Sequence, residues 1–166
     1  MSRAGNTIVA RVCGVIIGTL ACLLGVTPAH ADPAPGPALV GDTLYFALGN
    51  WNCSIRGDGV LGCDLAVPAA SMNVLVAGMQ ISLPNVPAII IDSSGWPAHP
   101  EWNSNGSHTL PGGNPALPRL NQASYHDPQF SVTHAGATCQ LTFNGAAVCT
   151  SLGRGFGQWG PVPHGY

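Results

Sequence analysis

Two segments of equal length, 53–63 and 139–149, each begin and end with cysteine, and they constrain the fold more than any other feature. In each, a three-residue loop with glycine in third place, Gly59 or Gly145, predicts a β-hairpin. Counting outward from the loop puts the two cysteines on a non-hydrogen-bonded pair, with Cα atoms about 4.5 Å apart, within reach of a disulfide. The sequence therefore predicts two local disulfides from two similar units. Their cysteines are Cys53, Cys63, Cys139 and Cys149.

The alternation of side chains along the first hairpin predicts its buried face. Trp51 and Ile55 share a face with the cysteines, whereas Ser54 and Arg56 take the other face. We expect the disulfide-bearing face to be the core face. Closing a loop of about 11 residues stabilises the fold by roughly 2.8 kcal/mol through lost chain entropy. Redox sites typically have two residues between their cysteines (C-x2-C), and zinc knuckles have C-x2-4-C. The C-x9-C spacing found here favours structural disulfides over both.

The first 31 residues have the three parts of a cleavable secretory signal peptide. Two arginines precede an apolar run over 12–26, and the small residues Ala29 and Ala31 precede the expected cleavage after residue 31. The run has about 15 residues, whereas a membrane span needs roughly 20. Cleavage is therefore favoured over a permanent anchor, and also over lipid attachment at Cys22. The mature protein is expected outside the cytoplasm, secreted or in the cell envelope, without a transmembrane segment.

The charge of the expected mature chain excludes several classes of partner. It has no lysine, and three arginines stand against six aspartates and one glutamate, which gives a formal net charge of −4. Nucleic-acid binding requires a basic face that displaces counterions from phosphates. Attraction to anionic lipids likewise requires positively charged side chains. We therefore expect no nucleic-acid partner.

The expected organisation is one β domain over 43–160, after a flexible segment at 32–42 and before a tail at 161–166. Its strands are short, apolar and bounded by Gly, Pro, Asn or Asp, and no amphipathic helix interrupts them. A long Pro/Gly-rich loop region occupies 93–128. The class predicted is all-β, a small antiparallel sandwich or barrel with two disulfide-closed hairpins. The expected strands are 43–48, 51–56, 60–67, 73–76, 79–83, 88–92, 129–134, 137–143 and 146–152.

Four short segments carry a resemblance to known proteins. They are Ala-His-Ala-Asp-Pro at 29–33, Trp51-Asn-Cys53, Gly62-Cys63-Asp64 and Cys149-Thr-Ser-Leu-Gly-Arg-Gly-Phe156. With these segments the chain resembles small exported proteins of uncharacterised function from mycobacteria and related actinobacteria. The resemblance implies an envelope or extracellular setting and supplies no activity. Similar sequences are expected to carry histidine where this chain has Arg154, so no role of that histidine transfers.

The best local cluster for catalysis or metal binding surrounds His99 and Glu101. A histidine and a carboxylate two residues apart, with His108 and the pair at 126–127 farther on, could supply a base or metal ligands. However, prolines fix the path of this loop, and the histidines show no repeated ligand spacing. No G-x-S-x-G elbow occurs elsewhere. We therefore expect no catalytic residue, metal or cofactor.

Tryptophans outside the hairpins are the best candidates for binding. Trp96, Trp102 and Trp159 lie in the loop or in the glycine-rich segment near the C-terminus, and exposed indoles suit sugar faces or apolar partners. The plainer alternative is that they fill gaps over a small core. The expected function is a secreted, non-catalytic β-domain that binds an envelope glycan, a lipid or a protein. The alternatives are a secreted hydrolase or metal-dependent enzyme using the His99 and Glu101 region, and a purely structural envelope protein.

Overall fold

Eleven β-strands and no helix form the part of the chain that the computed structural model describes, residues 36–117, 128–142 and 145–166. All of these residues belong to one unit, residues 33–166. The expected signal peptide lies outside the described residues, and within them no helix has the length and apolar character needed to cross a membrane. The strands are β1 (Ala38–Val40), β2 (Thr43–Leu48), β3 (Trp51–Ile55), β4 (Leu61–Val76), β5 (Met79–Ile91), β6 (His99–Pro100), β7 (Pro128–His134), β8 (Ala137–Thr142), β9 (Ala147–Ser151), β10 (Arg154–Gln158) and β11 (His164–Gly165).

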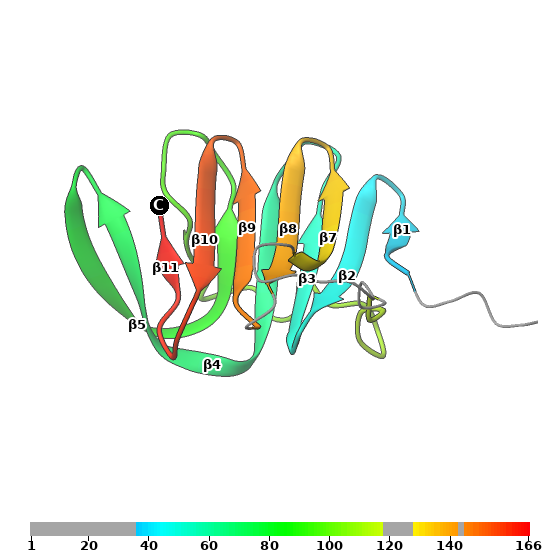
Figure 1. Cartoon of the computed structure of the whole chain (residues 1–166), viewed down its shortest axis with the longest axis horizontal. Helices are drawn as coiled ribbons and strands as arrows, with labels where there is room; N and C mark the ends of the chain where they lie inside the picture. The colour runs from blue at the N-terminus through cyan, green and yellow to red at the C-terminus, as the bar shows by residue number, and fades with distance from the viewer. Residues whose placement is uncertain (1–35, 118–127, 143–144) are drawn as a thin grey trace, which may run out of the picture. The chain divides into compact units, whose positions relative to one another are not determined.

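All eleven strands belong to one sheet that curls into an open half-barrel (Figure 1). The order is β1-β2-β3-β4-β11-β10-β9-β8-β7, while β5 pairs with β4 on its other side and β6 pairs with β5. Every strand pairing is antiparallel except that between β4 and β11, which is parallel. The predicted all-β class is therefore confirmed, and the hydrogen bonding gives one open sheet in place of two stacked ones.

Both predicted disulfides are present and local. Cys53 is paired with Cys63 across β3 and β4, with Cα atoms 4.0 Å apart. Cys139 is paired with Cys149 across β8 and β9, with Cα atoms 4.1 Å apart. The two hairpins place their cysteines in the register that loop counting predicts.

The loop of the first hairpin has the predicted conformation. The Arg56 amide donates to the Val60 carbonyl at 2.9 Å, and Gly59 adopts a φ of +86°. Gly145 has the corresponding φ of +79° in the second hairpin, whose residues 143–144 lie outside the described part. A side chain at either glycine would be strained, so the glycines determine the loop length and hence the cysteine register.

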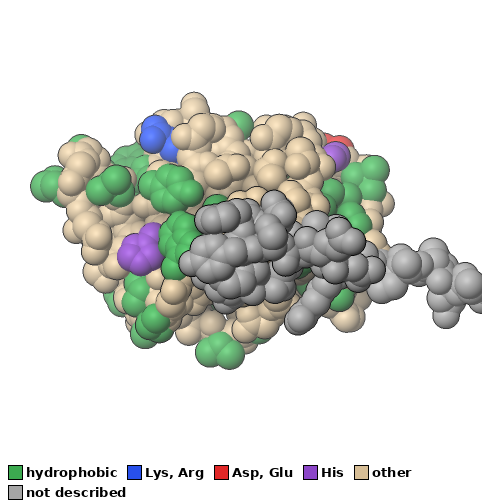
Figure 2. Space-filling model, in the orientation of Figure 1, with side chains coloured by type: hydrophobic (Ala, Val, Ile, Leu, Met, Phe, Trp, Pro, Cys, Tyr) green, Lys and Arg blue, Asp and Glu red, His purple; other side chains and the backbone are tan. Residues whose placement is uncertain are grey.

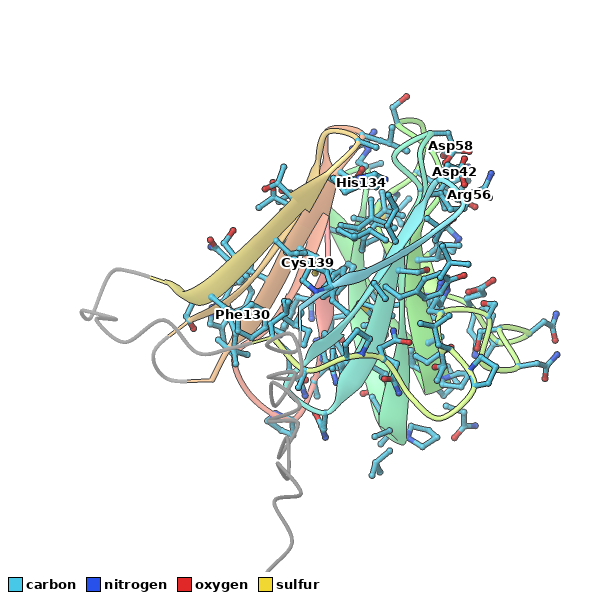
Figure 3. The ribbon with its side chains drawn as sticks, turned by 90° about the vertical axis from the view of Figure 1, so that its right-hand side faces the viewer. Asp42, Arg56, Asp58, Phe130, His134 and Cys139 are labelled. Carbon is cyan, nitrogen blue, oxygen red and sulfur yellow. A yellow bond between two sulfur atoms is a disulfide. The ribbon has the colours of Figure 1, made fainter. Side chains whose placement is uncertain are left out.

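The similarity of the two cysteine units extends to a third strand in each. β2 places Phe46 opposite Cys53, and β7 places Val132 opposite Cys139. Each unit is therefore a three-stranded antiparallel meander with its disulfide between the second and third strands. The sheet thus has two limbs, one with β2, β3 and β4 and the other with β7, β8, β9 and β10. Figure 3 shows the limbs facing each other, with the labelled Phe130 and Cys139 on the second limb.

The core lies between the two limbs, on the face that the strand alternation predicts. Trp51 on one limb and Phe156 on the other bring their ring centroids to 6.1 Å. The limbs also meet at their tips, where the Ser151 hydroxyl donates to the Gly59 carbonyl. The large side chains with almost no exposed surface are Phe46, Phe156, Leu48, Ile55, Leu61, Met72, Ile89, Ile91 and Val86.

The sheet extends beyond the strands expected from the sequence. β4 runs to Val76 through the Pro68 region, where a register shift between Asp64 and Ala69 accommodates the proline. β1 lies in the segment 32–42 that was expected to be flexible, and β11 lies in the expected tail. Of the expected loop region, the described residues 93–117 contain the two-residue strand β6 and an isolated bridge between Ala47 and Ala116.

β10 is a glycine-rich strand that the strand signals did not reveal. Its glycines have aromatic rings packed over them: a Cβ at Gly155 would lie 2.6 Å from the Tyr166 ring, and one at Gly157 would lie 2.5 Å from the Trp159 ring. Aromatic side chains supplied by the following residues thus cover a strand that has few side chains of its own.

Candidate functional site

An apolar groove of about 560 Å³ lies beside the long hairpin formed by β4 and β5. Its floor consists of Val74 and Val76 on β4 and Ile81 and Leu83 on β5. Alternate residues of a strand share a face, and Val74 stands directly opposite Ile81, so the hairpin presents four aliphatic side chains together.

Two of the predicted binding tryptophans form the walls of this groove. The side chains of Trp96 and Trp102 are 61% and 52% exposed, and both line the groove. The Trp102 indole is held in place because its Nε1 donates to the Pro84 carbonyl at 3.1 Å. The loop carrying Trp96 is tethered by Arg154, whose Nε and Nη2 donate to the Ser94 carbonyl at 2.8 and 2.6 Å. The indoles are therefore exposed yet attached to positioned backbone.

One end of the groove is polar, with Asp92, Ser93 and His99. The His99 Nδ1 lies 3.0 Å from the Pro97 carbonyl, which only accepts, so Nδ1 carries a hydrogen. Its Nε2 lies 3.8 Å from Oδ2 of Asp92. The groove thus combines a long apolar surface with a small set of hydrogen-bonding groups at one end, as ligand sites commonly do.

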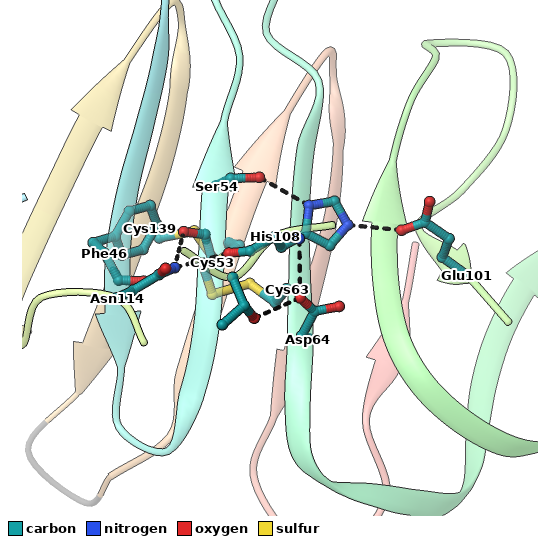
Figure 4. The surroundings of a disulfide bond; sticks show 11 residues. Phe46, Cys53, Ser54, Cys63, Asp64, Glu101, His108, Asn114 and Cys139 are labelled. Atoms are coloured by element: carbon teal, nitrogen blue, oxygen red, sulfur yellow. Dashed lines mark hydrogen bonds and ion pairs between the residues drawn. A yellow bond between two sulfur atoms is a disulfide. The ribbon is translucent and has the colours of Figure 1, made fainter. Parts of the chain in front are cut away.

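A second cluster centres on His108, on the outer face of β3 and β4 (Figure 4). Its Nε2 donates to Oε2 of Glu101 at 2.7 Å, and its Nδ1 lies 2.8 Å from the Ser54 hydroxyl. Asp64 Oδ2 accepts from the His108 amide at 2.9 Å and from the Thr109 hydroxyl at 2.7 Å. The other oxygen, Oδ1, is buried and has no partner among the described residues.

Asn114 fastens the end of the same loop to the sheet. Its Nδ2 donates to the carbonyls of Phe46, Cys53 and His108 at 3.2, 2.8 and 2.8 Å, and its Oδ1 accepts from the Leu110 amide at 2.8 Å. These contacts join the loop to two neighbouring strands, β2 and β3, close to the first disulfide (Figure 4). His108 and Asn114 together anchor the loop on the sheet.

The serine, histidine and glutamate of this cluster are connected like a nucleophile, a base and an acid. Nucleophilic attack requires the serine hydroxyl to reach a substrate, but Ser54 is 4% exposed and lies under the loop. Ser54, His108 and Glu101 have one another as hydrogen-bond partners instead. We therefore interpret the cluster as an anchor that satisfies buried polar groups and holds the loop in place.

No protein-family model, curated protein or solved structure matches the chain. Within residues 36–117, 128–142 and 145–166, no three His, Cys, Asp or Glu side chains gather as metal ligands would.

The structure separates several residues that the sequence grouped. Trp159 is 56% exposed but belongs to another hollow, formed with the loop residue Gly145 and with Gly160. His99 faces the groove and Asp92, whereas Glu101 bonds to His108, so the two residues of the proposed catalytic cluster have different partners. The histidine and aspartate at 126–127 lie outside the described residues.

Sequence reasoning did not assign roles to Ser54, Asp64 and Asn114. A local signal for the anchor does exist: the outward positions of the first hairpin carry small or polar residues, which leaves room and hydrogen-bonding groups for a covering loop. The identity of that loop depends on contacts between residues more than forty positions apart, which spacing alone does not encode.

Proposed function

We propose that this chain is an exported, non-catalytic β-domain that binds the hydrocarbon chain of a cell-envelope lipid in the tryptophan-walled groove. The observation that carries the proposal is the combination of four aliphatic floor residues with two exposed, positioned indoles. An acyl chain is apolar along its length and polar at one end, which matches the distribution of groups along the groove. Export is supported by the two disulfides, which persist in oxidising compartments.

The electrostatics of the groove favour a lipid with a neutral headgroup. Asp92 stands at its polar end with Ser93 and His99, and the expected mature chain has a net negative charge. An anionic headgroup would meet repulsion there, whereas the hydroxyl groups of a sugar can donate to the carboxylate and accept from Ser93. A neutral glycolipid therefore fits better than an acidic phospholipid.

A titration with a single-chain neutral glycolipid tests the proposal. Decyl maltoside is added below its micelle concentration while tryptophan emission is followed, and saturable binding with a blue shift is expected. Removing an indole wall, by Trp96→Ala or Trp102→Ala, should raise Kd by about 5–30-fold, equivalent to roughly 1–2 kcal/mol of lost apolar contact. Trp159→Ala is the matched control, because Trp159 is similarly exposed but lies in a different hollow, and its Kd should not change.

Two companion probes separate lipid binding from the other expected ligands. Maltose has the sugar without the chain, and decanoate has the chain with a negative head. Binding of maltose as tight as that of decyl maltoside would replace the lipid by a glycan. Absence of saturation with decyl maltoside, or equal weakening by all three tryptophan variants, would remove the groove as the ligand site.

A further inference from the structure

The hydrogen-bonding pattern of the β4–β5 hairpin leaves part of its outer edge open. The hairpin turns through Ala77 and Gly78, with φ values of +50° and +81°, so its loop has two residues and Val76 and Met79 form a hydrogen-bonded closing pair. Pairs alternate along an antiparallel ladder, so Ile81 and Leu83 also bond to β4. The amide and carbonyl groups of the residues between them, at 80 and 82, point away from β4.

Other groups occupy several positions farther along this edge. Pro84 has the same outward parity, and its carbonyl accepts from the Trp102 indole. Farther along, the Ala88 carbonyl accepts from the Glu101 amide at 2.8 Å, and β6 covers Ile89 and Ile90. Among the described strands, none pairs with Gln80 or Ser82 on the side away from β4, so this stretch of the β5 edge is open.

Residues 79–83 of the open stretch contain neither a charged side chain nor a proline, two features that keep sheet edges from pairing. Such edges are commonly protected by charged side chains or covered by a loop. Residues 65–91 contain no charged residue at all, and Met79 and Ile81 are 65% and 41% exposed. Figure 2 shows hydrophobic side chains at the left-hand end of the molecule, where the β4–β5 hairpin lies, whereas Asp and Glu on this face are confined to the right-hand side.

We propose that this edge pairs with the same edge of a second copy of the chain, antiparallel and around a two-fold axis at Ile81. Gln80 of each copy then lies opposite Ser82 of the other, and the two pairs exchange four backbone hydrogen bonds. The uncharged edge brings no like charges together. This inference goes beyond ligand binding and does not depend on it.

The polarity of the edge favours a second copy as the occupant. The polar–apolar–polar order of Gln80, Ile81 and Ser82 is preserved when the strand is turned around the axis. Ile81 therefore packs beside Ile81 of the second copy, in the closely spaced non-hydrogen-bonded position. Because Ile81 also belongs to the groove floor, each copy adds an aliphatic side chain next to the groove of the other.

Sedimentation equilibrium of the disulfide-bonded chain, produced through an oxidising secretory host, tests the pairing. The apparent mass should rise to twice that of one chain as concentration increases through about three decades around the micromolar range. Ser82→Pro removes the outward amide and should keep the mass at one chain throughout. Pro84 of the native chain occupies an equivalent position of β5, with its backbone nitrogen facing away from β4, so proline is compatible with such a position. Ser82→Ala keeps the amide and is the matched control, so it should double in mass like the parent chain.

Hydrogen exchange gives a measurement that does not rely on a folded proline variant. The amides of Gln80 and Ser82 in the parent chain should exchange about tenfold more slowly at high than at low concentration, while those at the tip, residues 77–78, should not change. A parent mass that stays at one chain, or exchange at 80 and 82 that is independent of concentration, would overturn the proposal. So would doubling that persists in a folded Ser82→Pro variant. Trp96→Ala should still double in mass, so failure of ligand binding and failure of pairing are distinguishable.

Discussion

The imidazole of His108 lies directly over Gly62, so that a Cβ at position 62 would overlap its Cε1 and Nε2 atoms. Gly62 lies near the start of β4, paired with both β3 and β5, and a glycine inside a sheet normally weakens the strand. Here its missing side chain is what allows the loop to dock flat on the sheet. The ring then reaches Ser54 on one side and Glu101 on the other. One glycine in the sheet thus determines where the loop beyond β6 lies.

Gly62→Ala should destabilise the fold by about 2–4 kcal/mol, because displacing His108 leaves buried hydrogen-bonding groups without partners. Urea unfolding followed by tryptophan fluorescence measures the change. Gly95→Ala is the matched control, since the nearest atom to its new Cβ would be the Ser93 hydroxyl at 4.0 Å. A Gly62→Ala protein as stable as the Gly95→Ala protein would show that the ring moves aside without loss.

Asn114→Asp should destabilise the chain by roughly 2–4 kcal/mol although the side chain keeps its shape. The amide nitrogen donates toward three carbonyls, and a carboxylate oxygen in its place would face three acceptors without a hydrogen to offer. The midpoint of thermal unfolding at neutral pH is a sufficient readout. Asn105→Asp changes an exposed amide of the same loop, and its midpoint should stay near that of the parent.

Replacing either cystine by two alanines should lower the free energy of unfolding by about 2–3 kcal/mol, since each bridge closes a loop of similar length. The variants are Cys53→Ala with Cys63→Ala, and Cys139→Ala with Cys149→Ala. Denaturant unfolding with and without reductant provides the comparison, because reductant should then remove only the remaining bridge. Stability unaffected by reduction of the parent chain would contradict a stabilising role.

Gly165→Ala should weaken the parallel pairing between β4 and β11, which is the seam that joins the two limbs of the sheet. A Cβ at Gly165 would overlap the Ala98 carbonyl, a backbone group that cannot rotate away. The Asn73 amide, which donates to the Pro163 carbonyl at 2.9 Å, should lose protection from hydrogen exchange first. Gly160→Ala, which meets no atom within 4 Å, serves as the control. Unchanged protection of Asn73 in Gly165→Ala would mean that the seam tolerates the added methyl group.

The hairpins were the most predictable part of this fold, and the reason is local. Loop length, a glycine with positive φ and side-chain alternation all act within about ten residues, so they predicted the cysteine register and the buried side of Trp51. Strand β2 was also predicted with its observed bounds, 43–48. In contrast, β10 and β11 depend on rings packed over glycines and on pairing with a distant strand, which local strand signals do not report.

The candidate site was predictable only in part. Exposure of Trp96 and Trp102 followed from their place among prolines and polar residues, but their meeting on one groove depends on the hairpin floor supplied by residues 74–83. The grouping of His99 with Glu101 assumed that nearness in sequence brings side chains together. The fold gives them separate partners, because Glu101 is drawn to His108 on the outer face of the sheet.

The parallel contact between β4 and β11 joins Asn73 to His164, across ninety residues of chain. A polypeptide is synthesised from its N-terminus, so the first cysteine hairpin can form long before its counterpart exists. β11, the strand that connects the two limbs, is synthesised after every other strand of the sheet. Closure of the sheet is therefore a late event that awaits the synthesis of β11, and until then both limbs expose their core faces to solvent and to other chains.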